Sequence, residues 1–480
     1  MAGSIVKSSA LYAAGTIARA ASSIIMLPIY TRYLSPEVYG TAELLNLILD
    51  LTILVLGARI TTGMFKFYSD ATDQNSKNTV LSTCLWLGVS INVLAICVLW
   101  LIAPIVASLL NTPEMSQPLQ WFAFTLAFGT VAEIGMGYFR VNDQAGKYLA
   151  FSLLKLALQI GASLYFIVHL ELGLWGIIYS ALFSGCVQTL LLLAFVIPKI
   201  GISYCHHLAI KLIKYSLPII YGSIAMYYMT FGDRYFIQHY NDLTEVGIYA
   251  LGYKFGFILT ALVWSPFMSY WGARQFDHAK EPNSAKTFSD TFYTANYILW
   301  AAATGMIIFV APAIHLMADS AYYKAIDIAP YIILAYLFQC WTEYHRFGIL
   351  KSGNTKYLNY YTWVTAAVIS ILYVLLIPLW GGVGAAIATA LAMFLRFALV
   401  YKKSQYYFHF SIDWLKIGLL ISLSFAGFQT LKILHNGSYI DFVYSVAIYI
   451  VIIILSIAIK FLPNSIITIA RTYLSTNKTE

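Results

Sequence analysis

Charged side chains are scarce in this chain. Asp, Glu, Lys and Arg make up only 10% of its 480 residues, whereas soluble domains carry about 25%. Hydrophobic residues account for 60%, and the mean hydropathy is +0.73. This composition excludes a soluble fold, because too few polar groups remain to cover a water-exposed surface. Apolar runs of roughly 20 residues, the length that crosses a bilayer, recur along the whole sequence and predict an integral membrane protein.

Cysteine is also rare, and metal-binding patterns are missing. The histidine pair His206-His207 lies in a basic loop near Lys211, which favours a solvated loop over a metal site. We therefore expect no metal ion and no cofactor. The five cysteines lack the spacing of zinc ligands or disulfide pairs, and they are Cys84, Cys97, Cys186, Cys205 and Cys340.

Long polar loops are absent as well. The segments between the apolar runs are short, and none holds the cluster of catalytic acids, bases or metal ligands that a membrane-bound enzyme needs. The formal net charge of +8 is spread over many loops, and this distribution excludes nucleic acid as a partner. We expect a protein that is not an enzyme.

The apolar runs predict an all-α membrane protein with about fourteen transmembrane helices. The first run follows Lys7 without a small-residue cleavage site, which indicates a retained span and not a signal peptide. The predicted spans are residues 8–30, 41–64, 80–110, 118–139, 148–170, 173–196, 212–238, 246–271, 288–314, 327–349, 357–378, 380–401, 414–434 and 441–462.

The loops alternate sharply in Lys and Arg content. By the positive-inside rule the basic loops are cytoplasmic, and an even number of spans predicts that both termini lie in the cytoplasm. The acidic loops contain Glu37, Glu114, Glu171, Asp242, Glu245, Asp319 and Asp441. The basic loops contain Lys66, Lys77, Arg140, Lys147, Lys199, Lys211, Lys214, Arg274, Lys280, Lys286, Lys351, Lys356, Lys402, Lys403 and Lys416.

An internal repeat with an offset of about 208 residues divides the chain in the manner of transporters built from duplicated bundles. Glu37-Val38 matches Glu245-Val246. Two further matches are Gly146-Lys147-Tyr148 with Thr355-Lys356-Tyr357, and Leu174-Trp175-Gly176 with Leu379-Trp380-Gly381. We predict six-helix lobes at residues 1–205 and 206–405, related by a pseudo-two-fold axis along the membrane normal. Two further helices and a cytoplasmic tail follow at residues 406–480.

Two segments carry a family resemblance. They are Arg32-Tyr33-Leu34-Ser35-Pro36-Glu37-Val38-Tyr39-Gly40, and Asp233-Arg234 followed by Glu245-Val246-Gly247-Ile248-Tyr249-Ala250. With the two lobes, they resemble the polysaccharide-exporter branch of the multidrug/oligosaccharidyl-lipid/polysaccharide superfamily, in particular the Wzx-type O-antigen and capsule repeat-unit flippases.

The resemblance implies a V-shaped pair of lobes around a central cavity, in the bacterial inner membrane. It implies movement of an undecaprenyl-diphosphate-linked oligosaccharide from the cytoplasmic to the periplasmic leaflet, as a step of lipopolysaccharide or other polysaccharide biosynthesis. The expected partners are this substrate, membrane lipid and neighbouring polysaccharide-assembly membrane proteins.

Four cations inside predicted spans are our candidate site residues, because a charged side chain there costs at least about 2.5 to 3.5 kcal/mol and should face a cavity or a partner. They are Arg19, Arg59, Arg234 and Lys254. Around one cavity they would bind a diphosphate, because arginine grips phosphate oxygens with two hydrogen bonds and lysine supplies a point charge. Two alternatives stay open: Arg59 can snorkel to the cytoplasmic interface, and Arg234 can form a structural pair with Asp233.

Acidic residues inside or beside the spans are candidates for binding a coupling proton or sodium ion, or for serving as counter-ions. They are Asp50, Glu133, Asp233 and Glu343. Glu133 and Glu343 lie 210 positions apart, close to the repeat offset, and Arg346 follows Glu343 by one helical turn. We favour a counter-ion role for Glu343, whereas Asp50 and Glu133 stay open.

The function that we expect is that of a flippase for lipid-linked oligosaccharides, acting by alternating access. A cation-coupled multidrug exporter of the same superfamily is the first alternative, but it would need an acid-dominated cavity, whereas the spans hold an excess of cations. A membrane-bound polysaccharide-assembly enzyme is the second alternative, but this chain lacks the catalytic loop that such an enzyme needs.

Overall fold

The structure is a computed structural model that describes residues 11–12, 14–15, 18, 24–56, 60–434 and 440–458. Nearly all of these residues are helical, and none of them forms a β-strand. The predicted all-α fold is confirmed.

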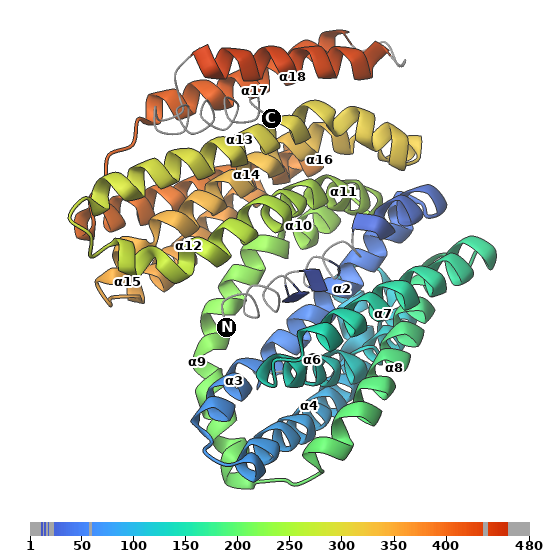
Figure 1. Ribbon diagram of the computed structural model, residues 1–480. Helices are drawn as coiled ribbons and strands as arrows, with labels where there is room; N and C mark the ends of the chain where they lie inside the picture. The colour runs from blue at the N-terminus through green and yellow to red at the C-terminus, as the bar shows by residue number, and fades with distance from the viewer. Residues whose placement is uncertain are drawn as a thin grey trace, which may run out of the picture. The chain divides into compact units, whose positions relative to one another are not determined.

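The chain divides into two compact units, residues 1–247 and 248–480, each built from long helices (Figure 1). The helices α9 and α10, which the repeat assigns to the second lobe, cluster with the first unit. The first unit contains α2 (Pro36–Leu56), α3 (Ile60–Asp70), α4 (Gln74–Leu109), α5 (Ser116–Ala123), α6 (Leu126–Val141), α7 (Ala145–Ser163), α8 (Gly173–Ile200), α9 (His206–Phe231), α10 (Asp233–Tyr240) and the first turn of α11 (Leu243–Leu259). The second contains the rest of α11, then α12 (Ser265–His278), α13 (Ser284–Met317), α14 (Ala325–His345), α15 (Phe347–Lys351), α16 (Lys356–Tyr407), α17 (Trp414–Leu434) and α18 (Ile440–Ala458).

Within the described residues, ten helical segments are long and apolar enough to cross a membrane. An eleventh is the bent pair His206–Leu217 and Ile220–Phe231, which meet at 48°. Nearly half of the first predicted span, residues 8–30, falls outside the described residues, and α16 covers two predicted spans. The chain is thus a multi-pass membrane protein, as predicted.

Apolar side chains cover the outer faces of these helices. Leu101, Leu316 and Leu415 are each about three-quarters exposed. In water such surface would promote aggregation, whereas lipid tails are as apolar as leucine and accept it. The exposed faces therefore fit a bilayer and not an aqueous environment.

Helix α16 is a tight hairpin of two spans. A straight helix of its 52 residues would be roughly 78 Å long, more than twice the hydrocarbon thickness of about 30 Å. The chain reverses at Gly381, whose φ of 55° and ψ of −133° favour glycine. Tyr373 and Thr389, on opposite arms, join their hydroxyl groups at 3.1 Å. The predicted boundary between spans 357–378 and 380–401 lies at this reversal.

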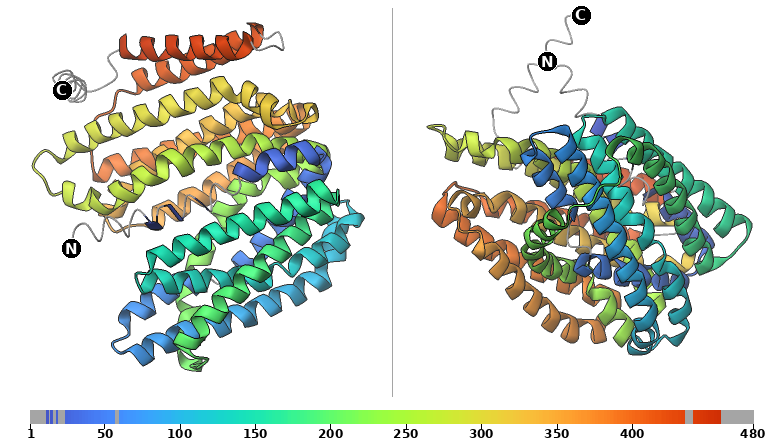
Figure 2. Two further views of the ribbon diagram at one scale, coloured as in Figure 1. Left: turned by 45° about the vertical axis from the view of Figure 1, so that its right-hand side comes forward. Right: turned by 90° about the horizontal axis from the view of Figure 1, so that it is seen from below.

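The last two helices pack on α13 in the second unit, and Figures 1 and 2 both show α17 and α18 beside it. Trp300 of α13 donates its indole N–H to the Leu420 carbonyl of α17 at 3.0 Å. Tyr449 of α18 donates its hydroxyl to the Ala301 carbonyl at 3.2 Å. Hydrogen bonds donated by the polar groups of aromatic side chains therefore join both helices to α13.

Candidate functional site

The first unit holds three adjoining cavities among its membrane helices. The cavity that we call the Lys155 cavity has a volume of about 340 Å³ and lies among α2, α5, α6, α7 and α8. The Asp50 cavity, of about 250 Å³, shares Glu133 with it. A third, of about 350 Å³, shares Tyr227 with the Asp50 cavity. A string of partly polar spaces therefore lies inside one unit.

Lys155 enters its cavity from the middle of α7 and is held by a polar network. Its Nζ donates to Ser184 Oγ of α8 at 3.2 Å, and that hydroxyl donates to Gln159 Oε1 at 2.7 Å. Gln159 Nε2 in turn contacts the hydroxyls of Ser163 at 3.3 Å and Ser180 at 3.4 Å. The network fixes the ammonium group at the cavity wall, because short side chains on two packed helices surround it.

Glu133 of α6 faces the same cavity with an exposed side chain. Among the described residues, Glu133 and Lys155 form no ion pair with each other. Two amides also line the cavity: Asn46 donates its nitrogen to the Ala42 carbonyl at 2.9 Å, and Gln188 donates to Phe151 at 3.4 Å. Their amide oxygens remain available as acceptors, so the cavity offers a cation, an anion and neutral acceptors together.

The Asp50 cavity joins α2 to α9. Tyr227 of α9 donates its hydroxyl to the Leu47 carbonyl of α2 at 2.9 Å, and Asp50 lines the same space. Thr130, also at its wall, donates to Asn92 Oδ1 at 3.0 Å. Asp50 and Glu133, both left open by the sequence, thus line one cavity.

Arg234 and Asp233 form a buried ion pair. Arg234 Nη1 lies 2.7 Å from Asp233 Oδ1, and the two residues are 1% and 0% exposed. Arg234 Nη1 also donates to the Thr230 carbonyl at 3.2 Å, and its guanidinium lies 5.0 Å from the centre of the Phe231 ring. This geometry corresponds to the structural pair that the sequence left open as an alternative, and binding of diphosphate by Arg234 stays a prediction.

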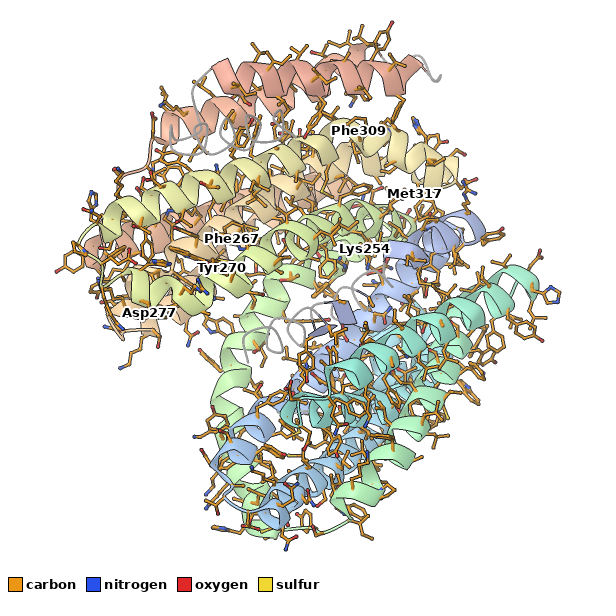
Figure 3. All side chains as sticks on the ribbon, in the orientation of Figure 1. Lys254, Phe267, Tyr270, Asp277, Phe309 and Met317 are labelled. Carbon is orange, nitrogen blue, oxygen red and sulfur yellow. The ribbon has the colours of Figure 1, made fainter. Side chains whose placement is uncertain are left out.

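Of the other three predicted cations, the structure describes one. Arg19 and Arg59 lie outside the described residues. Lys254 lies on α11, half-buried, and Figure 3 labels it in the second unit. The predicted gathering of four cations around one cavity therefore stays a prediction.

Glu343 of α14 has protein donors on both oxygens. Trp264 donates its indole N–H to Oε2 at 2.8 Å, and Arg346 Nη2 approaches Oε1 at 3.4 Å. Such contacts hold the carboxylate in place, and its role as a counter-ion stays a prediction.

Two cations inside spans were missed by the sequence analysis, namely Lys155 and Arg396. Arg396 contacts Thr362 Oγ1 at 3.4 Å. A signal existed, because both residues interrupt apolar runs within predicted spans 148–170 and 380–401. The hydrogen-bond partner of Lys155 comes from α8, more than twenty residues along the chain. Its surroundings therefore could not be predicted without the folded structure.

A metal centre is not found among the described residues, because no group of three or more His, Cys, Asp or Glu side chains gathers there.

The residues that line these cavities lie in a part of the chain that matches a known protein family. A family profile described as a polysaccharide biosynthesis protein matches residues 29–271, just over half of the chain. The chain belongs to this family. The matched region contains Asp50, Glu133, Lys155 and Lys254. No curated protein sequence matches the chain.

Several solved structures share the fold of this chain. "Lipid II flippase MurJ" in its inward closed conformation aligns with a TM-score of 0.72 at 14% identity, over 92% of this chain and 97% of that one. An inward-facing multidrug resistance transporter of the MATE family, in the MOP superfamily, aligns with a TM-score of 0.64 at 16% identity, over 82% and 93%. Its outward-facing counterpart gives 0.56 at 16% identity, over 84% and 95%. The fold is thus one shared by a lipid flippase and by drug transporters.

Proposed function

We propose that this protein is a flippase that moves an undecaprenyl-diphosphate-linked oligosaccharide from the cytoplasmic to the periplasmic leaflet of a bacterial inner membrane. The observation that carries the proposal is its membership of the polysaccharide biosynthesis family combined with the fold of a lipid II flippase over 92% of the chain. An O-antigen or capsule repeat unit is the cargo in question. Other polysaccharide-assembly membrane proteins are its proposed neighbours.

The polar cavities support transport because a glycan cannot cross a bilayer unaided. Sugar hydroxyls and a diphosphate lose their hydration in lipid, and unpaired polar groups there cost several kcal/mol each. Cavities lined by Asp50, Glu133 and Lys155 supply substitutes for water at that depth. Rocking of the two lobes, in the alternating-access scheme, then exposes the headgroup to either side.

We assign the diphosphate to the predicted cations Arg19, Arg59, Arg234 and Lys254. The Asp233 carboxylate already neutralises Arg234, so Arg234 binds a phosphate only at the expense of a buried ion pair. The lysine and the other two arginines are therefore the principal ligands in this proposal. Charge-assisted hydrogen bonds to phosphate are shorter and stronger than neutral ones.

A proton or sodium gradient is the proposed driving force. Asp50 and Glu133 line one cavity and belong to different helices, α2 and α6. An ion bound in this cavity would interact with carboxylates of both helices, so its binding would couple their positions. Glu343, with donors on both oxygens, is a counter-ion in this scheme.

A second candidate function is a cation-coupled multidrug exporter. The observation in its favour is the fold shared with MATE transporters, together with two carboxylates on one cavity wall. Lys155, which lines the adjoining cavity, weighs against it, since an ammonium group repels cationic drugs.

One assay separates these functions. Purified protein in liposomes is supplied with a fluorescent undecaprenyl-diphosphate glycan, and transfer between leaflets is followed by a quencher added outside, with and without a proton or sodium gradient. We expect transfer faster than in protein-free vesicles. Transfer no faster than in those vesicles under every gradient, combined with gradient-driven efflux of a cationic dye, would establish the drug exporter instead.

A further inference from the structure

The Lys155 cavity combines the groups that proteins use to bind uncharged sugars. The Lys155 ammonium donates hydrogen bonds, the Glu133 carboxylate accepts them, and the Asn46 and Gln188 amides add further acceptors. A sugar hydroxyl both donates and accepts, so one ring can satisfy several of these groups together. Small-molecule sites are mostly apolar with a few convergent polar groups, in cavities of about 300 to 1,000 Å³, and this cavity of about 340 Å³ has that character.

The cavity carries one cation and one anion, so its charges balance and give a charged ligand no net attraction. A carboxylated sugar would bring a second anion beside Glu133, and an amine would bring a second cation beside Lys155. A neutral ring meets neither repulsion and bridges the two groups through its hydroxyls. The cavity wall therefore complements a neutral polyhydroxyl compound.

The cavity is also prepared for a ligand. The serine and glutamine network holds Lys155 before anything binds, which reduces the ordering that binding requires. Space is kept open on the facing helix, because a Cβ built on Gly129 would meet no atom within 4 Å. Phe122 and Phe128 line the remaining wall and present apolar surface to the C–H face of a ring.

We propose that the Lys155 cavity binds one uncharged sugar ring of the lipid-linked substrate, with Lys155 donating to a ring hydroxyl and Glu133 accepting from another. This inference rests on the proposed function, because it assigns a part of the same substrate. It makes Lys155 a specificity-determining residue for the glycan, separate from the groups that bind the diphosphate.

The test compares two lipids on the full-length protein in nanodiscs. One is undecaprenyl diphosphate alone, and the other carries an N-acetylhexosamine–hexose disaccharide. We expect the wild-type protein to bind the glycosylated lipid more tightly. Lys155→Met should weaken that binding about tenfold, as expected for one hydrogen bond to a charged group, and should change the Kd for the bare lipid less than twofold.

A second variant acts through volume and leaves the charges in place. Gly129→Leu fills open space on α6, so the protein should fold, and it should lower affinity for the glycosylated lipid alone. The matched control is Lys147→Met on the same helix as Lys155. Lys147 contacts Gln144 at 3.1 Å on the exposed surface, and its loss should leave both affinities unchanged.

The possible failures are distinct. If the wild type binds and flips both lipids but the two cavity variants match it, the sugar site is refuted and the flippase stands. Equal losses for both lipids would place Lys155 in diphosphate binding, which also refutes the sugar site. Tighter binding of a uronic acid-bearing disaccharide than of the neutral one would overturn the assignment of an uncharged ring. If the wild type neither binds nor flips either lipid, the proposed function fails and this inference fails with it.

Discussion

Gly40 and Gly247 face each other across a helix crossing that has no room for a side chain. A Cβ built on Gly40 would collide with the Leu243 carbonyl oxygen, and one on Gly247 would collide with the Pro36 carbonyl oxygen. Both glycines therefore let the first turns of α2 and α11 touch backbone to backbone, as small residues do between membrane helices. The two turns are also the two copies of the Glu-Val repeat motif, at Glu37 and Glu245.

Gly247→Ala should destabilise the protein by about 1–3 kcal/mol, because the added methyl group overpacks a contact made by rigid backbone. The thermal midpoint in detergent measures the effect. Gly161→Ala, at a helical position where a Cβ meets no atom within 4 Å, is the control and should not lower the midpoint. Equal midpoints for Gly247→Ala and the wild type would show that the helices separate readily.

Asp233→Asn should destabilise the protein by about 3–5 kcal/mol, since it leaves the Arg234 charge buried without its counter-ion. The double variant Asp233→Asn/Arg234→Gln should recover part of the loss. The exposed pair Lys280–Asp277, labelled in Figure 3 at Asp277, provides the control: Asp277→Asn should have little effect on the midpoint. A stable Asp233→Asn protein would contradict the structural role of the pair.

Lys254→Ala should reduce flipping of the fluorescent glycolipid severalfold or more while the protein stays folded, because it removes one proposed diphosphate ligand. Arg19→Ala and Arg59→Ala should do the same. Lys280→Ala, which removes an exposed cation, should flip at the wild-type rate. Normal flipping by all three span variants would refute the cationic diphosphate site.

The start of α4 should respond to acid. Asp73 accepts from the Ser76 backbone N–H at 2.9 Å and from its hydroxyl at 2.6 Å, and these bonds lower the pKa of Asp73 below its ordinary value. The folded pKa is depressed, so the capping contribution is complete above the unfolded pKa of about 3.9 and is lost as pH falls through the folded value. Amide hydrogen exchange of residues 74–77 should accelerate over that range relative to its intrinsic pH dependence. Asp73→Asn should abolish this additional change; its persistence would implicate another group.

Both chain ends are predicted to be cytoplasmic. A reporter fused after Glu480 that is active only in the cytoplasm should therefore be active. The same reporter placed after Asp319, in an acidic loop, should be silent. The reverse pattern would show that the loops are inverted relative to the Lys and Arg rule.

Much of the fold follows from the sequence because lipid imposes simple demands. Every backbone group at membrane depth must be satisfied within a helix, so apolar length alone predicts the spans, and Gly381 lies at the reversal that the repeat motif indicates. The site is harder to predict. Lys155 occupies an apolar run that still passes as a span, and only its contact with Ser184 and the shared wall with Glu133 distinguish it. The ion pair of Arg234 with Asp233 is one of the alternatives that the sequence offers, because the two residues are adjacent.

The hairpin of α16 has a mechanical consequence. Its two arms are joined at Gly381 without a loop, and a hydrogen bond between the hydroxyl groups of Tyr373 and Thr389 links them near the reversal. Because no flexible loop joins the two arms, rotation of the first arm must rotate the second. The two spans therefore act as a single lever within their unit, and a flexible insertion at Gly381 would release one arm from the other.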